Sequence, residues 1–403
     1  MGVDPKDVRP TVLVVTHNYP RDPEDQAGRF IHTLISPIAD RYRFVVIAPH
    51  HAGLPLSETQ GGVDVVRFRY AADAEETLAY AGDMHEQVLK SWKKRILFLS
   101  FLRAMRQAVA RAIEAECPVA IHIHWWIPGG LAAAGLAARR KVPYLLTTHG
   151  SDVTLLAKFG WLRPVARPLF RRAAARTAVS TYLQRLLADL LEVDSALLPM
   201  PYDDTKFKPQ GDAGALPPLV TCIGRMIERK GQTYLIEAVN MLIARGIDCR
   251  LQLVGDGPQR SKLEAQAREI GILDRVTFTG NVPHREIPAL IGASALVVLP
   301  SVADWKGEVE GLGMVLAEAS ACARPVIATR LGGPIDAVDD GQTGLLVPPA
   351  DAAALADALA AMLTDPQKMR SLGLAGVDFA MSHFSPASQA AKLAELIEQI
   401  RSR

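Results

Sequence analysis

The chain has 403 residues, of which 49% are apolar and 22% are charged, and its formal net charge at pH 7 is +2. These values exclude a disordered chain, a collagen-like fibre and a coiled coil, and the length indicates two or more domains. No run of 18 apolar residues lacks a charge, and the first residues carry acids and prolines where a secretory signal needs a basic end and an apolar run. The four cysteines are far apart and form no C-x-x-C pair. We therefore expect neither a disulfide framework nor a cysteine zinc site, and a cytoplasmic location.

Short apolar runs alternate with longer helical patterns through the first half of the chain. The runs predict strands at 11–17, 44–49 and 142–150, and the longer patterns predict helices at 88–116 and 131–140. The stretch 197–218 is rich in Pro, Asp and Gly and lacks periodicity, so we interpret it as a domain boundary.

The same alternation restarts after this boundary. Strands are predicted at 219–224, 249–255, 275–280, 295–300 and 325–329. Alternating strands and helices are typical of a parallel sheet covered on both faces. The sequence therefore predicts two doubly wound α/β domains, 1–205 and 206–379, with a cleft between them and ligands beyond the carboxyl ends of the strands. We expect the C-terminal helix, 380–403, to pack back on the first domain.

Two cations and a glycine-rich turn stand out among the loops of the second half. Arg225 and Lys230 follow a predicted strand, across a turn closed by Gly231. Such a pair suits two phosphates, with arginine as a fork and lysine as a point charge, although ordinary surface charges have the same pattern. Gly311 and Gly313 leave backbone N–H groups open before a predicted helix, which favours an anion site.

Two glutamates flank this turn. Glu310 and Glu318 are eight residues apart, so both can face one ligand only if Glu310 precedes the helix. Carboxylates accept two hydrogen bonds from vicinal hydroxyls, so an extended ligand with hydroxyls at both ends and a phosphate between them fits. The neighbours of Glu318 are apolar, which predicts a buried helix. Burying a carboxylate without a partner costs free energy, which favours a functional role for Glu318. Pairing of Glu318 with Arg324 is the structural alternative.

The first half offers candidates at its own strand ends. His17 follows the first strand, and Gly28 precedes a helical pattern that could bind an anion at its start. His149 and Asp152 follow the strand at 142–150. A histidine at a strand end is alternatively a structural residue whose hydrogen bonds are satisfied.

A histidine pair lies on another predicted strand of the first half. His122 and His124 share one side of this strand, and Trp125 follows it. Histidines two apart raise the idea of a metal site, but the sequence offers no third ligand, and we reject it. Trp125 either stacks on a sugar ring or packs in the core.

Taken together, these motifs resemble the retaining glycosyltransferases of family 4. The resemblance covers nearly the whole chain and depends on the order and spacing of motifs that are weak singly. They are G-R-x(4)-K-G at 224–231, L-V-G-D-G-P at 253–258, F-x-G-x-V at 278–282, P-S at 300–301, E-x(7)-E from Glu310 to Glu318, and G-G at 332–333.

The resemblance implies the GT-B fold of two facing Rossmann-like domains and a nucleoside-diphosphate-sugar donor. Arg225 and Lys230 would clamp the diphosphate, Glu318 would hold the ribose, and Glu310 would bind the transferred sugar. The implied donor-binding residues are Gly28, Arg225, Lys230, Val282, Glu310, Gly311, Leu312, Gly313 and Glu318. The family has a glycine pair where this chain has Ala27-Gly28, which leaves the shape of that loop open.

For catalysis the resemblance points to His149 of the H-G-x-D motif, together with Glu310. A neutral imidazole would hydrogen-bond the sugar and support charge in the transition state. Asp152 would orient His149 or meet the acceptor, and the acceptor-side candidates are His17, His124, Trp125 and Asp152. No carboxylate is evident for a double displacement, so the resemblance favours front-face transfer. The chain has no Asp-x-Asp, so we expect neither a metal nor another cofactor.

The acceptor is expected to be a glycan, a lipid-linked molecule or a small molecule. Residues 90–176 hold 16 basic and three acidic residues, which favours peripheral contact with an anionic membrane at its inner face. An ordinary amphipathic core helix explains 91–113 as well, and no nucleic-acid motif accompanies the charge. Two other functions stay open at this point, a sugar-nucleotide epimerase and a non-catalytic nucleotide-sugar binding protein.

Overall fold

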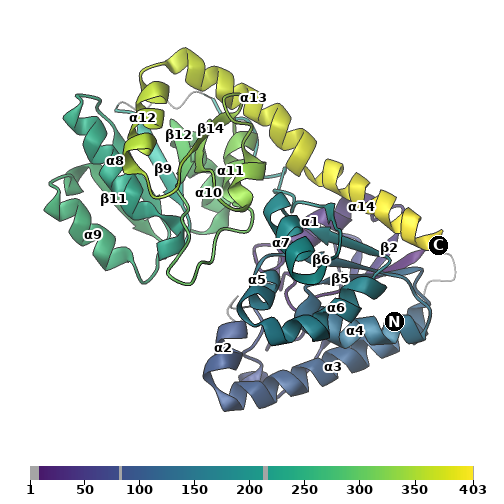
Figure 1. Ribbon diagram of the computed structural model, residues 1–403. Coiled ribbons are helices and arrows are strands. Elements are labelled where there is room, and N and C mark those ends of the chain that lie inside the picture. Colours follow the sequence, from purple (N-terminus) through teal and green to yellow (C-terminus); the bar gives the residue numbers. More distant parts are fainter. Residues whose placement is uncertain (1–8, 81–83, 212–216, 403) are drawn as a thin grey trace. The chain divides into compact units, whose positions relative to one another are not determined.

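The computed structural model describes all residues except 1–8, 81–83, 212–216 and 403. The chain forms two compact units (Figure 1). The first is Met1–Pro201 with Gln389–Arg403, and the second is Tyr202–Ser388. The sequence placed the boundary a few residues later, at 205/206. None of the helices in the described parts of the chain has the length and apolar character needed to cross a membrane.

The first unit contains an eight-stranded sheet in the order β3-β4-β2-β1-β5-β6-β7-β8. All neighbours pair in parallel except β3, which runs antiparallel to β4. The strands are β1 (Thr11–Val15), β2 (Arg43–Pro49), β3 (Ser57–Gln60), β4 (Val63–Phe68), β5 (Ala120–His124), β6 (Tyr144–Thr148), β7 (Ala175–Ala178) and β8 (Ala196–Leu197).

Helices cover this sheet on both faces. They are α1 (Arg29–Ile35), α2 (Met84–Lys90), α3 (Trp92–Glu116), α4 (Leu131–Arg139), α5 (Ser151–Lys158), α6 (Arg163–Arg172), α7 (Thr181–Leu191) and α14 (Pro386–Arg401). The helix predicted at 88–116 is two helices, because Ser91 adopts an extended conformation between α2 and α3. The C-terminal helix α14 is held in the first unit by Glu398, which accepts hydrogen bonds from Arg41 and Tyr42.

The second unit contains a six-stranded parallel sheet in the order β11-β10-β9-β12-β13-β14. Its strands are β9 (Leu219–Ile223), β10 (Arg250–Val254), β11 (Val276–Gly280), β12 (Leu296–Leu299), β13 (Val326–Thr329) and β14 (Gly344–Val347). Its helices are α8 (Gln232–Ala244), α9 (Arg260–Glu269), α10 (Ile287–Ala293), α11 (Met314–Ala321), α12 (Ala352–Leu363) and α13 (Pro366–Phe384).

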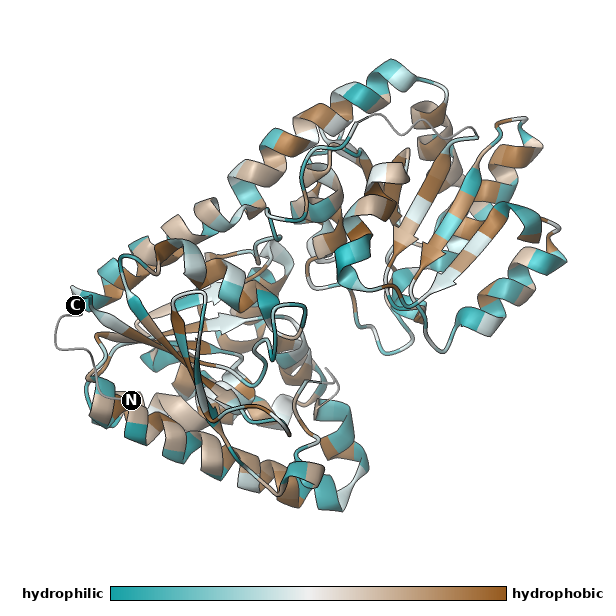
Figure 2. Cartoon of the chain, turned by 180° about the vertical axis from the view of Figure 1, so that it is seen from behind, coloured by the Kyte–Doolittle hydropathy of each residue, from teal (hydrophilic) through white to brown (hydrophobic). Residues whose placement is uncertain are grey.

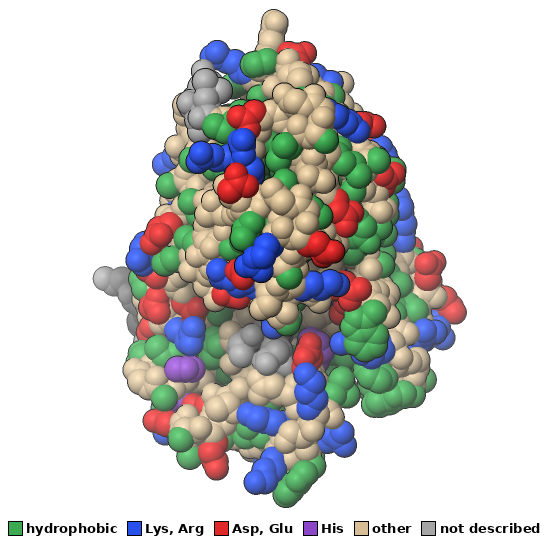
Figure 3. All heavy atoms as spheres, turned by 90° about the vertical axis from the view of Figure 1, so that its left-hand side faces the viewer, with side chains coloured by type: hydrophobic (Ala, Val, Ile, Leu, Met, Phe, Trp, Pro, Cys, Tyr) green, Lys and Arg blue, Asp and Glu red, His purple; other side chains and the backbone are tan. Residues whose placement is uncertain are grey.

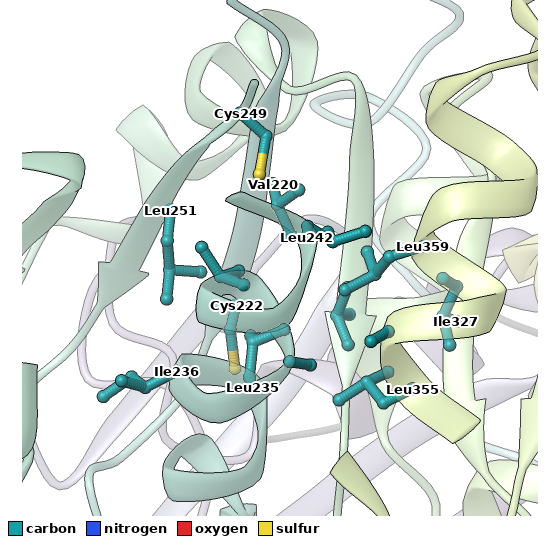
Figure 4. Close-up of a cluster of buried hydrophobic side chains, with 14 of the residues drawn as sticks. Val220, Cys222, Leu235, Ile236, Leu242, Cys249, Leu251, Ile327, Leu355 and Leu359 are labelled. Atoms are coloured by element: carbon teal, nitrogen blue, oxygen red, sulfur yellow. The ribbon is translucent and has the colours of Figure 1, made fainter. Parts of the chain in front are cut away.

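The core of the second unit explains why these segments fold together. Most strand residues are apolar, with a few polar ones between them, whereas apolar and polar residues alternate around the helices (Figure 2). Side chains of β9 and β10 such as Val220 and Leu251 meet Leu235 of α8 and Leu359 of α12, all fully buried or nearly so (Figure 4). Burying one such side chain contributes roughly 1.5–3 kcal/mol.

Each sheet has a point where the direction of strand order reverses. It lies between β1 and β5 in the first unit and between β9 and β12 in the second. In open parallel sheets, ligands bind beyond the carboxyl ends of the strands at such a point. The loops after these four strands are therefore where a site is expected, and they carry most of the residues that the sequence singled out.

Candidate active site

An ion pair joins two candidate residues in the second unit. Lys230 Nζ lies 2.8 Å from Glu310 Oε2, and both side chains are largely buried. Burial pushes the pKa of Glu310 up, but the charge and hydrogen bond of Lys230 outweigh it and hold the pKa below its usual value. Gly224 has φ +152°, and a Cβ there would lie 3.2 Å from Lys230 Cε, so this glycine leaves room for the lysine. The structure thus connects the loop after β9 with the loop after β12.

Arg225 differs from the other cations of this loop. Its side chain is exposed and forms no ion pair with any residue that the structure describes. Arg229, by contrast, pairs with Glu308 at 3.2 Å. Arg225 is therefore the cation that can take an added anion without losing a partner.

The turn from Glu310 to Gly313 is fixed by the glycine pair 332–333. The Gly333 N–H donates to the carbonyl of Glu310 at 2.9 Å. A Cβ on Gly333 would lie 1.9 Å from the Gly311 oxygen, so a larger residue would displace the turn. Gly313 is in the left-handed region, with φ +82°, directly before α11. Leu312 is buried, whereas Gly311 is half-buried.

Glu318 lies on α11, whose other residues are mostly buried, as the sequence predicted. Its partner is not Arg324, which donates to the backbone carbonyls of Gly211 and Gly292. Instead, Glu318 Oε1 lies 3.6 Å from Nε2 of His284. Sequence reasoning missed His284, although it lies only two residues beyond the candidate Val282, which is half-buried in the loop after β11.

The candidates of the first unit converge around His149. Its Nε2 lies 2.9 Å from Nδ1 of His124, and its ring centroid is 4.1 Å from that of Trp125. Trp125 in turn contacts His17 edge-on at 4.3 Å. Burial lowers the pKa of His149 well below its usual value, so its imidazole is neutral near pH 7. His124 is fully buried, so it contacts His149 and is not exposed to an acceptor.

Asp152 holds the backbone around His149. Its Oδ1 accepts the N–H groups of His149, Gly150 and Val153, and its Oδ2 accepts the N–H of Trp126, all between 3.1 and 3.2 Å. The side chain is 1% exposed. Burial raises the pKa of Asp152 to about 6 even though four amides hydrogen-bond its charged form. Asp152 thus fixes the backbone that carries His149.

Gly28 contacts the loop after β1. It has φ +71°, and a Cβ there would lie 2.1 Å from the Asn18 oxygen. Backbone packing alone therefore requires glycine at this position.

A pocket of about 270 Å³ opens beside these side chains in the first unit. His17, Trp125 and Asp152 line it together with apolar residues of α2, α3 and α5.

Two family descriptions match the chain in these same two units. "Glycosyl transferase 4-like domain" matches residues 12–201, and "Glycosyl transferases group 1" matches residues 217–365. A relative from Mycolicibacterium smegmatis, a "GDP-mannose-dependent alpha-(1-6)-phosphatidylinositol monomannoside mannosyltransferase", is 36% identical over 66% of this chain and 73% of its own length. The chain belongs to the group 1, GT4-type glycosyltransferases.

Two further comparisons are a relative that is named for a different sugar and a solved structure with a similar fold. An "Alpha-D-kanosaminyltransferase" of Streptomyces kanamyceticus is also 36% identical, over 45% of this chain and 46% of its own length. The solved structure of sucrose-phosphate synthase from Thermosynechococcus elongatus superposes with a TM-score of 0.75 at 24% identity, covering 98% of this chain and all of that one. This likeness confirms the GT-B fold that the sequence predicted.

One group of metal-ligand side chains occurs in the part of this glycosyltransferase that the structure describes: His50, Asp73 and Glu76. His50 Nδ1 lies 2.5 Å from Glu76 Oε2, and Nε2 lies 2.9 Å from the Leu54 oxygen. Asp73 pairs with Arg69. Both imidazole nitrogens are thus occupied, so the group is explained as a hydrogen-bond network within the fold.

Proposed function

We propose that the enzyme transfers a hexose from a nucleoside-diphosphate sugar to a lipid-linked acceptor, with retention and without a metal. The observation that carries this proposal is the Lys230–Glu310 ion pair beside Arg225, which pairs with no described residue, at the carboxyl ends of the neighbouring strands β9 and β12. Cations at this position can form charge-assisted hydrogen bonds with a diphosphate, and the neighbouring carboxylate can accept hydrogen bonds from sugar hydroxyls.

The negative charge that develops on the leaving group during transfer would lie beside cations that the fold already holds in place. Arg225 and Lys230 would stabilise the negative charge of the departing diphosphate. Lys230 would exchange Glu310 for phosphate, which frees the glutamate to accept hydrogen bonds from the transferred sugar. The neutral imidazole of His149 would hydrogen-bond the sugar during transfer, and the leaving diphosphate would take the acceptor proton from the same face.

The donor to test first is GDP-mannose. The Mycolicibacterium smegmatis relative uses it, by its name, whereas the kanosaminyltransferase of equal identity is named for another sugar. The same relative acts on a phosphatidylinositol monomannoside, which supports a lipid-linked acceptor.

Exposed apolar side chains support peripheral contact with an anionic membrane through 90–176. Trp92, Leu99 and Trp161 are 66%, 66% and 72% exposed, and basic residues such as Lys93 and Arg95 lie beside them in the chain. Figure 3 shows apolar and basic side chains side by side on the lower part of one face. The core-helix alternative applies only to the later turns of α3, from Phe101 to Ile113, whose apolar residues are buried.

The test is donor binding and transfer by Arg225→Gln and Lys230→Gln, with Arg245→Gln as the matched control. Arg245 is also an arginine of the second unit, but it pairs with Asp357 at the exposed end of α8. We expect both site variants to lose at least tenfold in donor affinity by calorimetry, because each removes a charge-assisted hydrogen bond to phosphate. Equal affinity in all three variants contradicts the proposal. Sugar products formed from donor alone would indicate an epimerase instead.

A further inference from the structure

The pocket in the first unit has walls of two kinds. Polar groups come from His17 and Asn18 in the loop after β1, from Ser151 and Asp152 at the start of α5, and from His85 of α2. The remaining walls are mostly aliphatic and aromatic side chains of the surrounding helices and turns. They include Met84 and Val88 of α2, Phe98 of α3, Leu155 of α5, and Phe159 and Leu162 around the 3-10 turn Gly160–Leu162.

The apolar part of the pocket reaches the protein surface. Leu89 and Trp161 line it and are nevertheless 46% and 72% exposed. Trp92 and Leu99 of α3 also expose apolar side chains, although they are outside the lining. A chain-like ligand can therefore enter from the surface without displacing a buried residue.

The polar part of the pocket adjoins the histidine cluster. Trp125 lines the pocket and contacts both His17 and His149 through its ring. The Nδ1 atom of His17 is buried and has no hydrogen-bond partner in the described residues. Burial also lowers the pKa of His17 to about 4, so its imidazole is neutral and can serve a hydroxyl as donor or acceptor.

We propose that this pocket binds the hydrocarbon chain of an amphiphilic acceptor and places its hydroxyl-bearing head at His17, beside His149. Assigning the head as the acceptor rests on the proposed function, whereas the chain site does not. A sugar or a peptide would leave its polar groups unpaired against Val88, Phe98 and Leu155, and that costs free energy. A cation is disfavoured too: Lys158 Nζ lies 5.7 Å over the ring of the lining Phe159. Among the lining residues that the structure describes, Asp152 is the one carboxylate, and backbone amides already engage it.

The first experiment measures binding of n-alkyl α-mannosides with chains from methyl to dodecyl, each below its micelle concentration. Calorimetry gives the affinity, and tryptophan fluorescence reports through Trp125 and Trp161. Each buried methylene should raise the affinity about fourfold, since its transfer from water is favourable. The gain should stop once the chain outgrows a pocket of about 270 Å³. An affinity independent of chain length, or one that rises without levelling off, overturns the proposal.

Two filled variants separate the pocket from the nearby surface. Val88→Trp and Leu155→Trp place an indole among the lining residues, while Val165→Trp adds one at a position that is 46% exposed on α6 and outside the lining. We expect at least a tenfold loss of dodecyl mannoside affinity in both filled variants and none in the control. Equal affinity in all three overturns the proposal. Leu155→Trp keeps the test valid if Val88→Trp does not fold, as judged by circular dichroism.

Transfer assays with the same acceptors distinguish the two proposals. If chain-dependent binding occurs without transfer from any nucleotide sugar, the pocket stands and the proposed function fails. If methyl mannoside is as good an acceptor as dodecyl mannoside, the function stands and the chain site fails. The expected result is a KM that falls with chain length while kcat changes little.

Discussion

Asp152 shows how a single side chain can hold the backbone of a neighbouring candidate residue in place. Its two oxygens receive four backbone N–H groups from the segments that carry Trp126 and His149. A neutral amide has one acceptor oxygen, and its NH₂ group would oppose an N–H donor. The orientation of His149 therefore depends on a charge buried three residues away.

We predict that Asp152→Asn lowers the free energy of unfolding by about 1–3 kcal/mol, the usual cost of unsatisfied buried donors. It should also reduce kcat more than donor affinity, because His149 lies in the other unit from Arg225 and Lys230. Urea unfolding and steady-state kinetics measure the two effects. Wild-type stability in the variant would show that the amides do not depend on the carboxylate.

The neutral state of His149 leads to a prediction about pH. Burial holds its pKa well below the ordinary value of 6.5, so its protonation should not change between pH 6 and 8. We expect His149→Gln to lower kcat by about 100-fold at every pH in this range, within the usual range for a positioned hydrogen-bonding group. A limb in the wild-type profile near pH 6.5 that disappears in the variant contradicts this assignment.

At the scale of an element, the turn Glu310–Gly313 depends on a neighbouring loop for its shape. Gly332 and Gly333 contact its backbone so closely that neither position accepts a side chain without movement. The sequence shows the glycine pair after the strand at 325–329, but its contact with the turn is a tertiary one. The candidate donor site thus combines the loops that follow two successive strands.

We predict that Gly333→Ala weakens donor binding at least tenfold, because its Cβ would lie 1.9 Å from the Gly311 oxygen. Gly135→Ala is the matched control, since Gly135 lies inside α4 with open space around its Cβ position, and alanine favours a helix there. Calorimetry with GDP or UDP gives the comparison. An unchanged affinity in Gly333→Ala would mean that the turn tolerates displacement.

Helix α3 divides into an exposed part and a buried part. Its first turns expose Trp92, Ile96 and Leu99, whereas Phe101 and Met105 are fully buried. One apolar stripe in the sequence therefore has two environments, since only the later turns have a sheet to pack against.

We predict that reversing the charges of Lys93, Arg95, Arg171 and Arg172 to Glu abolishes co-sedimentation with anionic vesicles. The membrane surface potential contributes about 1 kcal/mol for each basic residue near it. Reversing Arg250 and Arg268, exposed in the second unit, should leave binding unchanged. Loss of binding in the control, or retention in the first variant, contradicts membrane contact through 90–176.

At the scale of the whole molecule, the buried histidines make stability depend on pH. His122 is 1% exposed, and burial lowers its pKa to about 3. The unfolded chain takes up this proton below pH 6.5, whereas the folded chain takes it up only near pH 3. Its contribution is therefore complete above pH 6.5 and is lost as the pH falls toward 3.

We predict that the free energy of unfolding, measured by urea titration, falls steadily between pH 7 and pH 4, by up to about 3 kcal/mol for His122 alone. Asp152 acts with the opposite sign, because its folded pKa of about 6 lies above its ordinary value. The stability that Asp152 gains on acidification offsets much of the loss from one histidine. His17, His124 and His149 add to the loss of stability, because burial lowers their pKa values as well. His122→Gln should be less sensitive to acid. A midpoint that rises on acidification contradicts this account.

Much of the fold could be predicted because buried parallel strands are continuous apolar runs. All the strands predicted from such runs exist, with bounds shifted by at most two residues. Several strands escaped prediction, among them two short polar ones. β3 reads SETQ and β7 reads ARTA, and they are strands because a neighbour supplies hydrogen bonds. The pattern of residues within one segment does not show which other strand will pair with it.

The amino-acid sequence alone determined the two α/β units, the family and the residue types at each strand end. Tertiary structure decided which of these residues meet: Lys230 with Glu310, Glu318 with His284 rather than Arg324, and His124 with His149. It also turned Asp152 inward and opened the apolar pocket. The physical reason is that spacing fixes the face or end on which a side chain lies, whereas partners and burial depend on segments far apart in the chain.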